Sequence, residues 1–264
     1  MSFDLARVTA QLATGEVTWS LHYEPSCDST QDLARTAAAG GAAPGWTVTT
    51  DLQLRGRGRH GRSWTAPAEK ALLFSTVLQP PVDVLPLLPL LAAVTVAGGV
   101  ELSTGAAPQL KWPNDVLLNG KKLAGILLER PPGSSVILGV GLNANQSAAE
   151  LPEGATSLAV ELGHPVEREA LLAAILNDLG NAYERADREG VDWILPGWRS
   201  RTAMLGKPVT FRRDGVLLRG LAEDVGADGA LLVRTADGSR LSIVAGDVEL
   251  VRPDQAKAAK NPQS

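Results

Sequence analysis

Three Asp-Gly pairs near the end of the chain constrain its fold more than any other sequence feature. Asp214-Gly215, Asp228-Gly229 and Asp237-Gly238 separate short apolar runs between "GKPVTF" and "VELV". Asp-Gly is a preferred sequence for the tight turn of a β-hairpin, and short strands at this spacing are typical of a small antiparallel barrel. We therefore expect about five strands in a small β domain at residues 204–252.

The chain before residue 204 mixes strand patterns with helix patterns. Apolar runs rich in β-branched residues predict buried strands at 46–53, 71–79 and 135–143. Asn119-Gly120 predicts a hairpin between "VLL" and "KKLAGILLE". Helices are expected after the cap candidates Asp28, Ser29 and Thr30, ending at Gly40-Gly41, and at 86–103, 156–162, 168–188 and 191–200. Residues 1–203 should thus form an α/β body, and the polar tail at 253–264 should be disordered.

Composition excludes several classes of protein. The 29 acidic residues outnumber the 25 basic ones, whereas a surface devoted to nucleic acid is usually basic. The single cysteine, Cys27, excludes a disulfide framework and a multi-cysteine metal cluster. The most apolar stretch, at 83–101, is short for a membrane span and contains prolines, so it predicts a buried helix. Because the N-terminus has no signal-peptide pattern, we expect a soluble, cytoplasmic protein with no membrane partner.

Residues 55–62, "RGRGRHGR", hold four arginines and three glycines. Guanidinium groups suit carboxylate and phosphate oxygens, and the glycines let the backbone approach a ligand closely. No strand–glycine turn–helix pattern surrounds the segment, so it is neither a dinucleotide-binding fingerprint nor a P-loop. We expect a loop that is mobile when empty and closes over an anion. The alternatives are a solvated surface loop and a segment that touches RNA.

Four segments follow one another in a recognisable order: "CDST" at 27–30, "QLRGRGRHGRSW" at 53–64, "KWPNDVLLNGKKLAGILLE" at 111–129 and "GVGLN" at 139–143. Together they closely resemble biotin protein ligases. The resemblance implies a catalytic domain at 1–203 similar to class II aminoacyl-tRNA synthetases, and an SH3-like barrel at 204–252. Some members of the family carry an N-terminal helix-turn-helix domain. Only a short segment precedes the body here, so we expect the short form, which does not bind DNA.

The reaction implied by the resemblance has two steps. Biotin's carboxylate attacks the α-phosphate of ATP, giving biotinyl-AMP and pyrophosphate, and a lysine of an acceptor protein then takes the biotin. ATP is expected to bring Mg²⁺, and the sequence shows no metal ligands of its own. The expected acceptor is the biotin carboxyl carrier domain of an acyl-CoA carboxylase. A homodimer is possible, because family dimers form through sheet edges.

The resemblance also assigns site residues. Matches to the biotin site are Ser29, Thr30, Gln31, Gln53, Gly56, Arg57, Lys122, Gly139 and Gly141. Matches to the nucleotide site are Arg57, Arg59, Trp64, Asn114, Lys122 and Asn143. The catalytic residues are expected to be Lys122, Asp115 and Arg59.

Asp115 and Lys122 lie on either side of the predicted hairpin turn, so the two side chains could converge. A lysine near its usual pKa is rarely neutral at pH 7, so the second step needs a carboxylate to receive or orient its proton. We hypothesise that Asp115 does this.

Each site residue also has a structural interpretation. Ser29 and Thr30 could be helix caps, Trp64 a core anchor, Lys122 a solvated charge on a strand edge and Asp115 a turn cap. Rival functions are a lipoate ligase or octanoyltransferase, a nucleic-acid-binding module and a vitamin-binding sensor without chemistry. The sequence assigns no purpose to Arg55.

Overall fold

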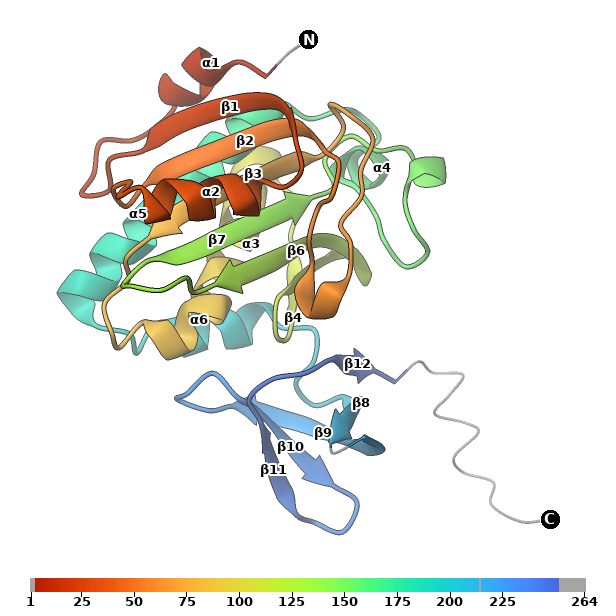
Figure 1. Cartoon of the computed structure of the whole chain (residues 1–264). Coiled ribbons are helices and arrows are strands. Elements are labelled where there is room, and N and C mark those ends of the chain that lie inside the picture. The colour runs from red at the N-terminus through yellow and green to blue at the C-terminus, as the bar shows by residue number, and fades with distance from the viewer. Residues whose placement is uncertain (1–2, 214, 252–264) are drawn as a thin grey trace.

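The computed structural model describes residues 3–213 and 215–251 (Figure 1). The larger part is built on a seven-stranded mixed sheet in the order β1-β2-β3-β7-β6-β5-β4. Its strands are β1 (Ser20–Cys27), β2 (Trp46–Gln53), β3 (Leu72–Leu78), β4 (Gln109–Lys111), β5 (Asp115–Leu118), β6 (Lys121–Glu129) and β7 (Val136–Leu142). Only the pair β1 and β2 is parallel among these strands.

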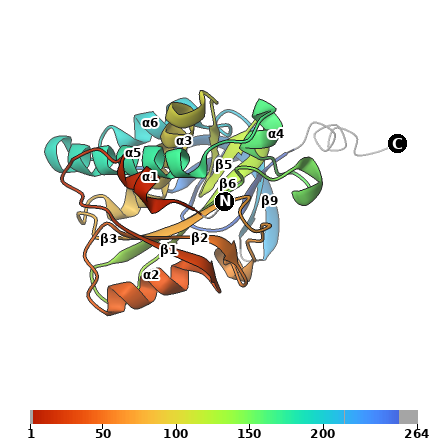
Figure 2. The ribbon, with the colours of Figure 1, turned by 90° about the horizontal axis from the view of Figure 1, so that it is seen from above.

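Helices cover both faces of the sheet. They are α1 (Leu5–Thr9), α2 (Thr30–Ala39), α3 (Leu88–Thr104), α4 (Leu158–Leu162), α5 (Arg168–Glu189) and α6 (Ile194–Arg201), with short 3-10 turns η1 (Arg59–Gly61), η2 (Leu85–Leu87) and η3 (Ala148–Glu150). Figure 2 shows α2 on one face and α3, α5 and α6 on the other. Helix α2 packs against β2, β3 and β7. Its N-terminus, which Ser29 caps, therefore lies beside the centre of the sheet.

The main core lies between the sheet and the pair α3 and α5. Helix α3 is apolar on all sides and approaches α5 very closely at Gly99, where an added Cβ would lie 2.6 Å from Ile175 Cα. The segment Leu85–Thr104 has the length and composition of a membrane span. However, 61% of the apolar 18-residue window within it is buried inside the protein. It is therefore a core helix, as the sequence predicts.

The smaller part is a five-stranded antiparallel sheet in the order β11-β10-β9-β8-β12. Its strands are β8 (Pro208–Arg213), β9 (Val216–Val225), β10 (Leu231–Thr235), β11 (Arg240–Ile243) and β12 (Val248–Leu250). It lies below the larger part in Figure 1. Contacts that join them include a hydrogen bond from Trp112 Nε1 to the carbonyl of Gly229 at 3.0 Å and an ion pair between Arg199 and Asp224 at 2.6 Å.

Most predicted elements are confirmed within a few residues, including the strand at 46–53, the Asn119-Gly120 hairpin and the five C-terminal strands. Strands β1 and β4 were not expected. Strand β1 lies at the sheet edge, contains Pro25 and is largely exposed, so its sequence lacks the buried pattern of a central strand. Strand β4 has only three residues. The tail predicted at 253–264 lies outside the described residues.

Candidate active site

One cavity of about 120 Å³ brings together most of the residues that the sequence singled out. Those that line it are Ser29, Thr30, Gln31, Gln53, Arg57, Arg59, Trp64, Asn114, Asp115, Lys122, Gly139 and Gly141. Two others lie nearby but are not among its lining residues. Gly56 is at the base of the arginine loop. Asn143 is buried, with its amide bonded to the Thr156 carbonyl and to Gln146.

One end of the cavity is a chain of buried polar side chains. Gln53 Oε1 accepts hydrogen bonds from the Thr30 backbone N–H at 2.9 Å and from its hydroxyl at 3.1 Å. The Thr30 and Ser75 hydroxyls are 2.8 Å apart, and Ser75 donates to Gln31 Oε1 at 2.8 Å. Ser29 caps α2 and also lines the cavity, so its structural and site interpretations both hold. Ser75 was missed, although its one signal is a hydroxyl within the apolar run "LLFSTVL".

Glycines on β6 and β7 leave room for two site side chains. An added Cβ at Gly139 would lie 2.4 Å from Gln31 Oε1, and one at Gly141 would lie 2.5 Å from the Trp64 ring. Gly125 faces the same ring, although the sequence does not single it out. A Cβ added there would lie 3.0 Å from the Trp64 ring. Any larger residue here would push Gln31 or Trp64 out of place, because these contacts are shorter than real Cβ contacts.

The hairpin register explains how Asp115 and Lys122 meet. The two-residue turn, with Asn119 and Gly120 both at positive φ, pairs Leu118 with Lys121 and Leu117 with Lys122. Because side chains alternate along a strand, Lys122 then lies on the same face as Asp115. Lys122 Nζ is 2.6 Å from the Asp115 carboxylate.

A bulge between Val116 and Leu117 shifts the register of the hairpin beyond the pair of Leu117 and Lys122. As a result, Asp115 lies opposite Gly125. Gly125 in turn pairs with Gly141 on β7. A lysine and a glycine three positions apart in sequence therefore share the cavity face, and Ala124 is directed into the core.

The arginine loop is narrow, because its first arm (residues 56–58) pairs with its second arm (residues 62–64). The Trp64 N–H donates to the Gly56 carbonyl at 2.9 Å, and the Gly58 N–H donates to the Arg62 carbonyl at 2.7 Å. Gly56 is required at this crossing, because an added Cβ would lie 2.2 Å from the Trp64 carbonyl oxygen. The sequence does not predict this paired geometry.

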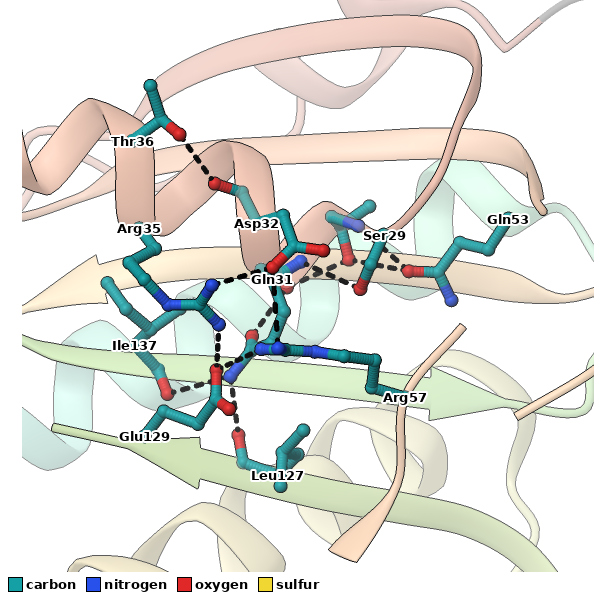
Figure 3. Close-up of polar contacts among 12 residues, drawn as sticks. Ser29, Gln31, Asp32, Arg35, Thr36, Gln53, Arg57, Leu127, Glu129 and Ile137 are labelled. Atoms are coloured by element: carbon teal, nitrogen blue, oxygen red, sulfur yellow. Dashed lines mark hydrogen bonds and ion pairs between the residues drawn. The ribbon is translucent and has the colours of Figure 1, made fainter. Parts of the chain in front are cut away.

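The guanidinium of Arg57 is directed toward carboxylates on the sheet and on α2. It lies 2.5 Å from Glu129 on β6 and 3.4 Å from Asp32 on α2. Arg35 on α2 bridges the same two carboxylates, each at 2.7 Å. Figure 3 shows these four side chains converging beside Gln31. Arg57 thus fixes the first arm of the loop to the body.

The other loop arginines have separate partners. Arg59 donates to Asn114 Oδ1 at 3.0 Å, and Asn114 donates to the Ile126 carbonyl at 2.7 Å. Burial lowers the pKa of the Arg59 guanidinium, although the nearby carboxylates of Asp247 and Asp115 act in the opposite direction. Arg55, to which no role is assigned from the sequence, is exposed and pairs with Asp28 at 2.9 Å.

The smaller part of the protein also reaches the cavity. Asp247 pairs with Arg62 of the loop, and Glu249 lies 2.5 Å from Lys111 Nζ. All four side chains line the cavity. Asp247 and Glu249 were missed, and no local pattern marks them, because they meet residues more than a hundred positions earlier in the chain.

Comparisons with known proteins place the chain in a family. A model of the "Biotin/lipoate A/B protein ligase family" matches residues 23–144, and one of the "Biotin protein ligase C terminal domain" matches residues 204–251. The "Biotin--[acetyl-CoA-carboxylase] ligase" of Paracoccus denitrificans is 34% identical over 227 residues, which cover 81% of this chain and 94% of that protein. The "Bifunctional ligase/repressor BirA" of Bacillus subtilis is 34% identical over 240 residues, covering 87% and 74%.

A solved structure supports the same conclusion. The biotin protein ligase from Aquifex aeolicus, in complex with biotin and ATP, superposes with a TM-score of 0.77 at 28% identity. The match covers 88% of this chain and 99% of that one. Fold and sequence therefore agree, and the chain belongs to the biotin protein ligase family.

Proposed function

We infer that the protein attaches biotin to a lysine of a carrier protein by way of biotinyl-AMP, with release of pyrophosphate. The observation that carries this inference is one cavity with a neutral polar end and a cationic end. Thr30, Gln53 and Ser75 line the first, and Lys122 and Arg59 line the second. A neutral ureido ring and an anionic phosphate need these two kinds of surroundings.

The first step joins two anions. A carboxylate oxygen of biotin forms a bond to the α-phosphorus of ATP as the bond to pyrophosphate breaks. We propose that Lys122 stabilises the charge at the carboxylate and the phosphate, and that Arg59 stabilises the adenylate under the closed loop. The anchored Arg57 would hold the loop in register, and its backbone rather than its guanidinium would face biotin.

The remaining assignments concern orientation. We propose that Ser29, Thr30, Gln31 and Gln53 bind the vitamin end, with Gly139 and Gly141 leaving the space. Trp64 and Asn114 would contact the nucleotide, and the buried, unpartnered Nε1 of Trp64 is a donor free for a ligand.

Asn143 would act on the nucleotide end from behind the cavity wall. A magnesium ion would enter with ATP and keep phosphate and water ligands.

The test is direct. The protein is incubated with ATP, magnesium, biotin and a biotin carboxyl carrier domain, and the carrier is weighed by mass spectrometry. We expect one added biotin, none without ATP, and none when lipoic acid replaces biotin. An unmodified carrier together with absence of biotinyl-AMP would contradict the proposal.

Association into a homodimer stays a prediction, which light scattering with and without ligand would test.

Replacement of Asp115 by asparagine should separate the two steps. We expect pyrophosphate release to continue and transfer to the carrier lysine to slow by about 10²- to 10⁴-fold, the usual contribution of a general base. Single-turnover assays with preformed biotinyl-AMP measure transfer, and pyrophosphate exchange measures the first step. Loss of exchange with transfer intact would contradict the role.

Replacement of Arg59 by glycine should let biotinyl-AMP escape. The loop tip would lose its hydrogen bond to Asn114, so water and foreign amines would reach the anhydride. We expect bystander albumin in the assay to become biotinylated. Arg55→Gly is the matched control, because Arg55 lies on the same loop but does not line the cavity. Albumin labelling that is equal in both variants would argue against the role.

A further inference from the structure

The cavity mouth has a charge arrangement that the two-step reaction leaves unexplained. An anionic nucleotide must bind here, yet the smaller part of the protein places two carboxylates at the mouth. Asp247 pairs with Arg62 on the second arm of the loop, and Glu249 lies 2.5 Å from Lys111 Nζ. Two cavity cations are thus already neutralised in the free protein.

The loop arms differ in how they are held. Arg57, on the first arm, contacts Glu129 and Asp32, and Arg35 bridges these carboxylates on the same body. Arg62, on the second arm, is 58% exposed and its partner Asp247 is 47% exposed. Exposed pairs are weak and are screened by salt. The pair between Arg62 and Asp247 is therefore the one that a polyanion can break, while backbone hydrogen bonds still join the two arms.

We propose that Asp247 and Glu249 form a carboxylate latch, which holds Arg62 and Lys111 in the free enzyme and releases them to the phosphates of the nucleotide. The latch rests on the proposed function only for the identity of that polyanion. Phosphates carry more charge than a carboxylate and accept hydrogen bonds from the same cationic donors, so they can compete with Asp247 and Glu249 for Arg62 and Lys111. When pyrophosphate leaves, the carboxylates take the cations back, which favours product release.

The first test uses trypsin, which cleaves after the loop arginines. Asp247→Asn should release the second arm, so loop cleavage in the free protein should rise about two- to five-fold, the factor that an exposed pair supplies. Glu223→Gln is the matched control. Glu223 pairs with Arg234 and Arg240 on the same sheet and does not line the cavity. Equal loop cleavage in Asp247→Asn and native protein would overturn the latch.

Salt provides a second measurement that needs no variant. Raising sodium chloride should increase loop cleavage in the native protein and in Glu223→Gln, because it weakens the Arg62–Asp247 pair. It should have little effect in Asp247→Asn, where the pair is already absent. A peptide substrate for trypsin corrects for salt effects on the protease. The same salt response in all three proteins would contradict the proposal.

Kinetics then link the latch to the nucleotide. In both Asp247→Asn and Glu249→Gln, KM for ATP in biotinyl-AMP formation should fall about two- to five-fold, and inhibition by added pyrophosphate should strengthen. A rise in KM would mean that the carboxylates help to bind ATP, and would overturn the latch. If the native protein makes no biotinyl-AMP, the proposed function fails, while the trypsin comparison still decides whether the latch exists.

Discussion

Replacing Lys122 with alanine should reduce the rate of biotinyl-AMP formation by about 10²- to 10³-fold, the usual loss when one charge-stabilising donor is removed from a preorganised site. Lys122 lines the cavity 2.6 Å from Asp115. Lys111, the other cavity lysine among the described residues, lies on β4 and contacts Glu249 instead of Asp115.

Lys121→Ala is the matched control, because Lys121 is the adjacent residue on β6 but is exposed and outside the cavity lining. It should retain nearly native activity. Pyrophosphate release, followed with a coupled assay, measures the rate, and thermal unfolding verifies that both variants fold. Equal losses in the two variants, or a Lys122→Ala enzyme within tenfold of native, would rule out the assigned role.

Asp51→Asn should cost about 3 to 5 kcal/mol of unfolding free energy, because it leaves a buried guanidinium without its counter-charge. Arg168 and Asp51 are only 7% and 8% exposed, and they pair at 2.7 Å. Arg168 also donates to the Ala71 carbonyl at 3.2 Å, and Tyr23 donates to Asp51 at 2.6 Å. The pair thus ties α5 to β1, β2 and the start of β3.

Glu189→Gln is the control, because Glu189 forms an exposed pair with Arg185 on α5. It should cost at most about 0.5 kcal/mol. Urea unfolding measures both changes. A cost below about 1 kcal/mol for Asp51→Asn would show that the pair contributes little to the free energy of unfolding.

Alkaline pH should weaken the same network. Burial and the hydrogen bond to Asp51 raise the pKa of Tyr23 from 10.0 to about 12. This contribution to stability is full below the unfolded pKa and is lost as the pH rises from 10.0 to about 12.

The features that could be predicted from the sequence are those set by neighbours along the chain. The Asn119-Gly120 turn fixes the hairpin register, and that register brings Asp115 and Lys122 onto one face. The cap at Ser29 places α2 in the same way. These depend on local backbone preferences, which single residues carry.

Other features depend on packing between distant segments and have no local signal. Arg57 matches a ligand-binding arginine, yet its partner Glu129 is 72 positions away. Arg62 and Asp247 are 185 positions apart. The first pair follows from how the loop packs on the sheet, and the second from how the two parts of the protein dock; no run of residues encodes either. Ser75 lies between these two cases. Its hydroxyl can be noticed in an apolar run of the sequence, but its contacts with Thr30 and Gln31 cannot be predicted from that run.

The place of β12 has a practical consequence for anyone who handles this enzyme. It is the last strand in the described part of the chain, and the carboxylates at the cavity mouth lie on it or immediately before it. An affinity tag or fusion partner joined shortly after Val251 would begin beside the substrate entrance. Helix α1, by contrast, packs on α5 and β1, at the opposite end of the molecule in Figure 1. Fusions at the amino end should therefore leave turnover intact. Truncation after Ile243, by contrast, would remove Asp247, Val248 and Glu249 from the lining of the cavity.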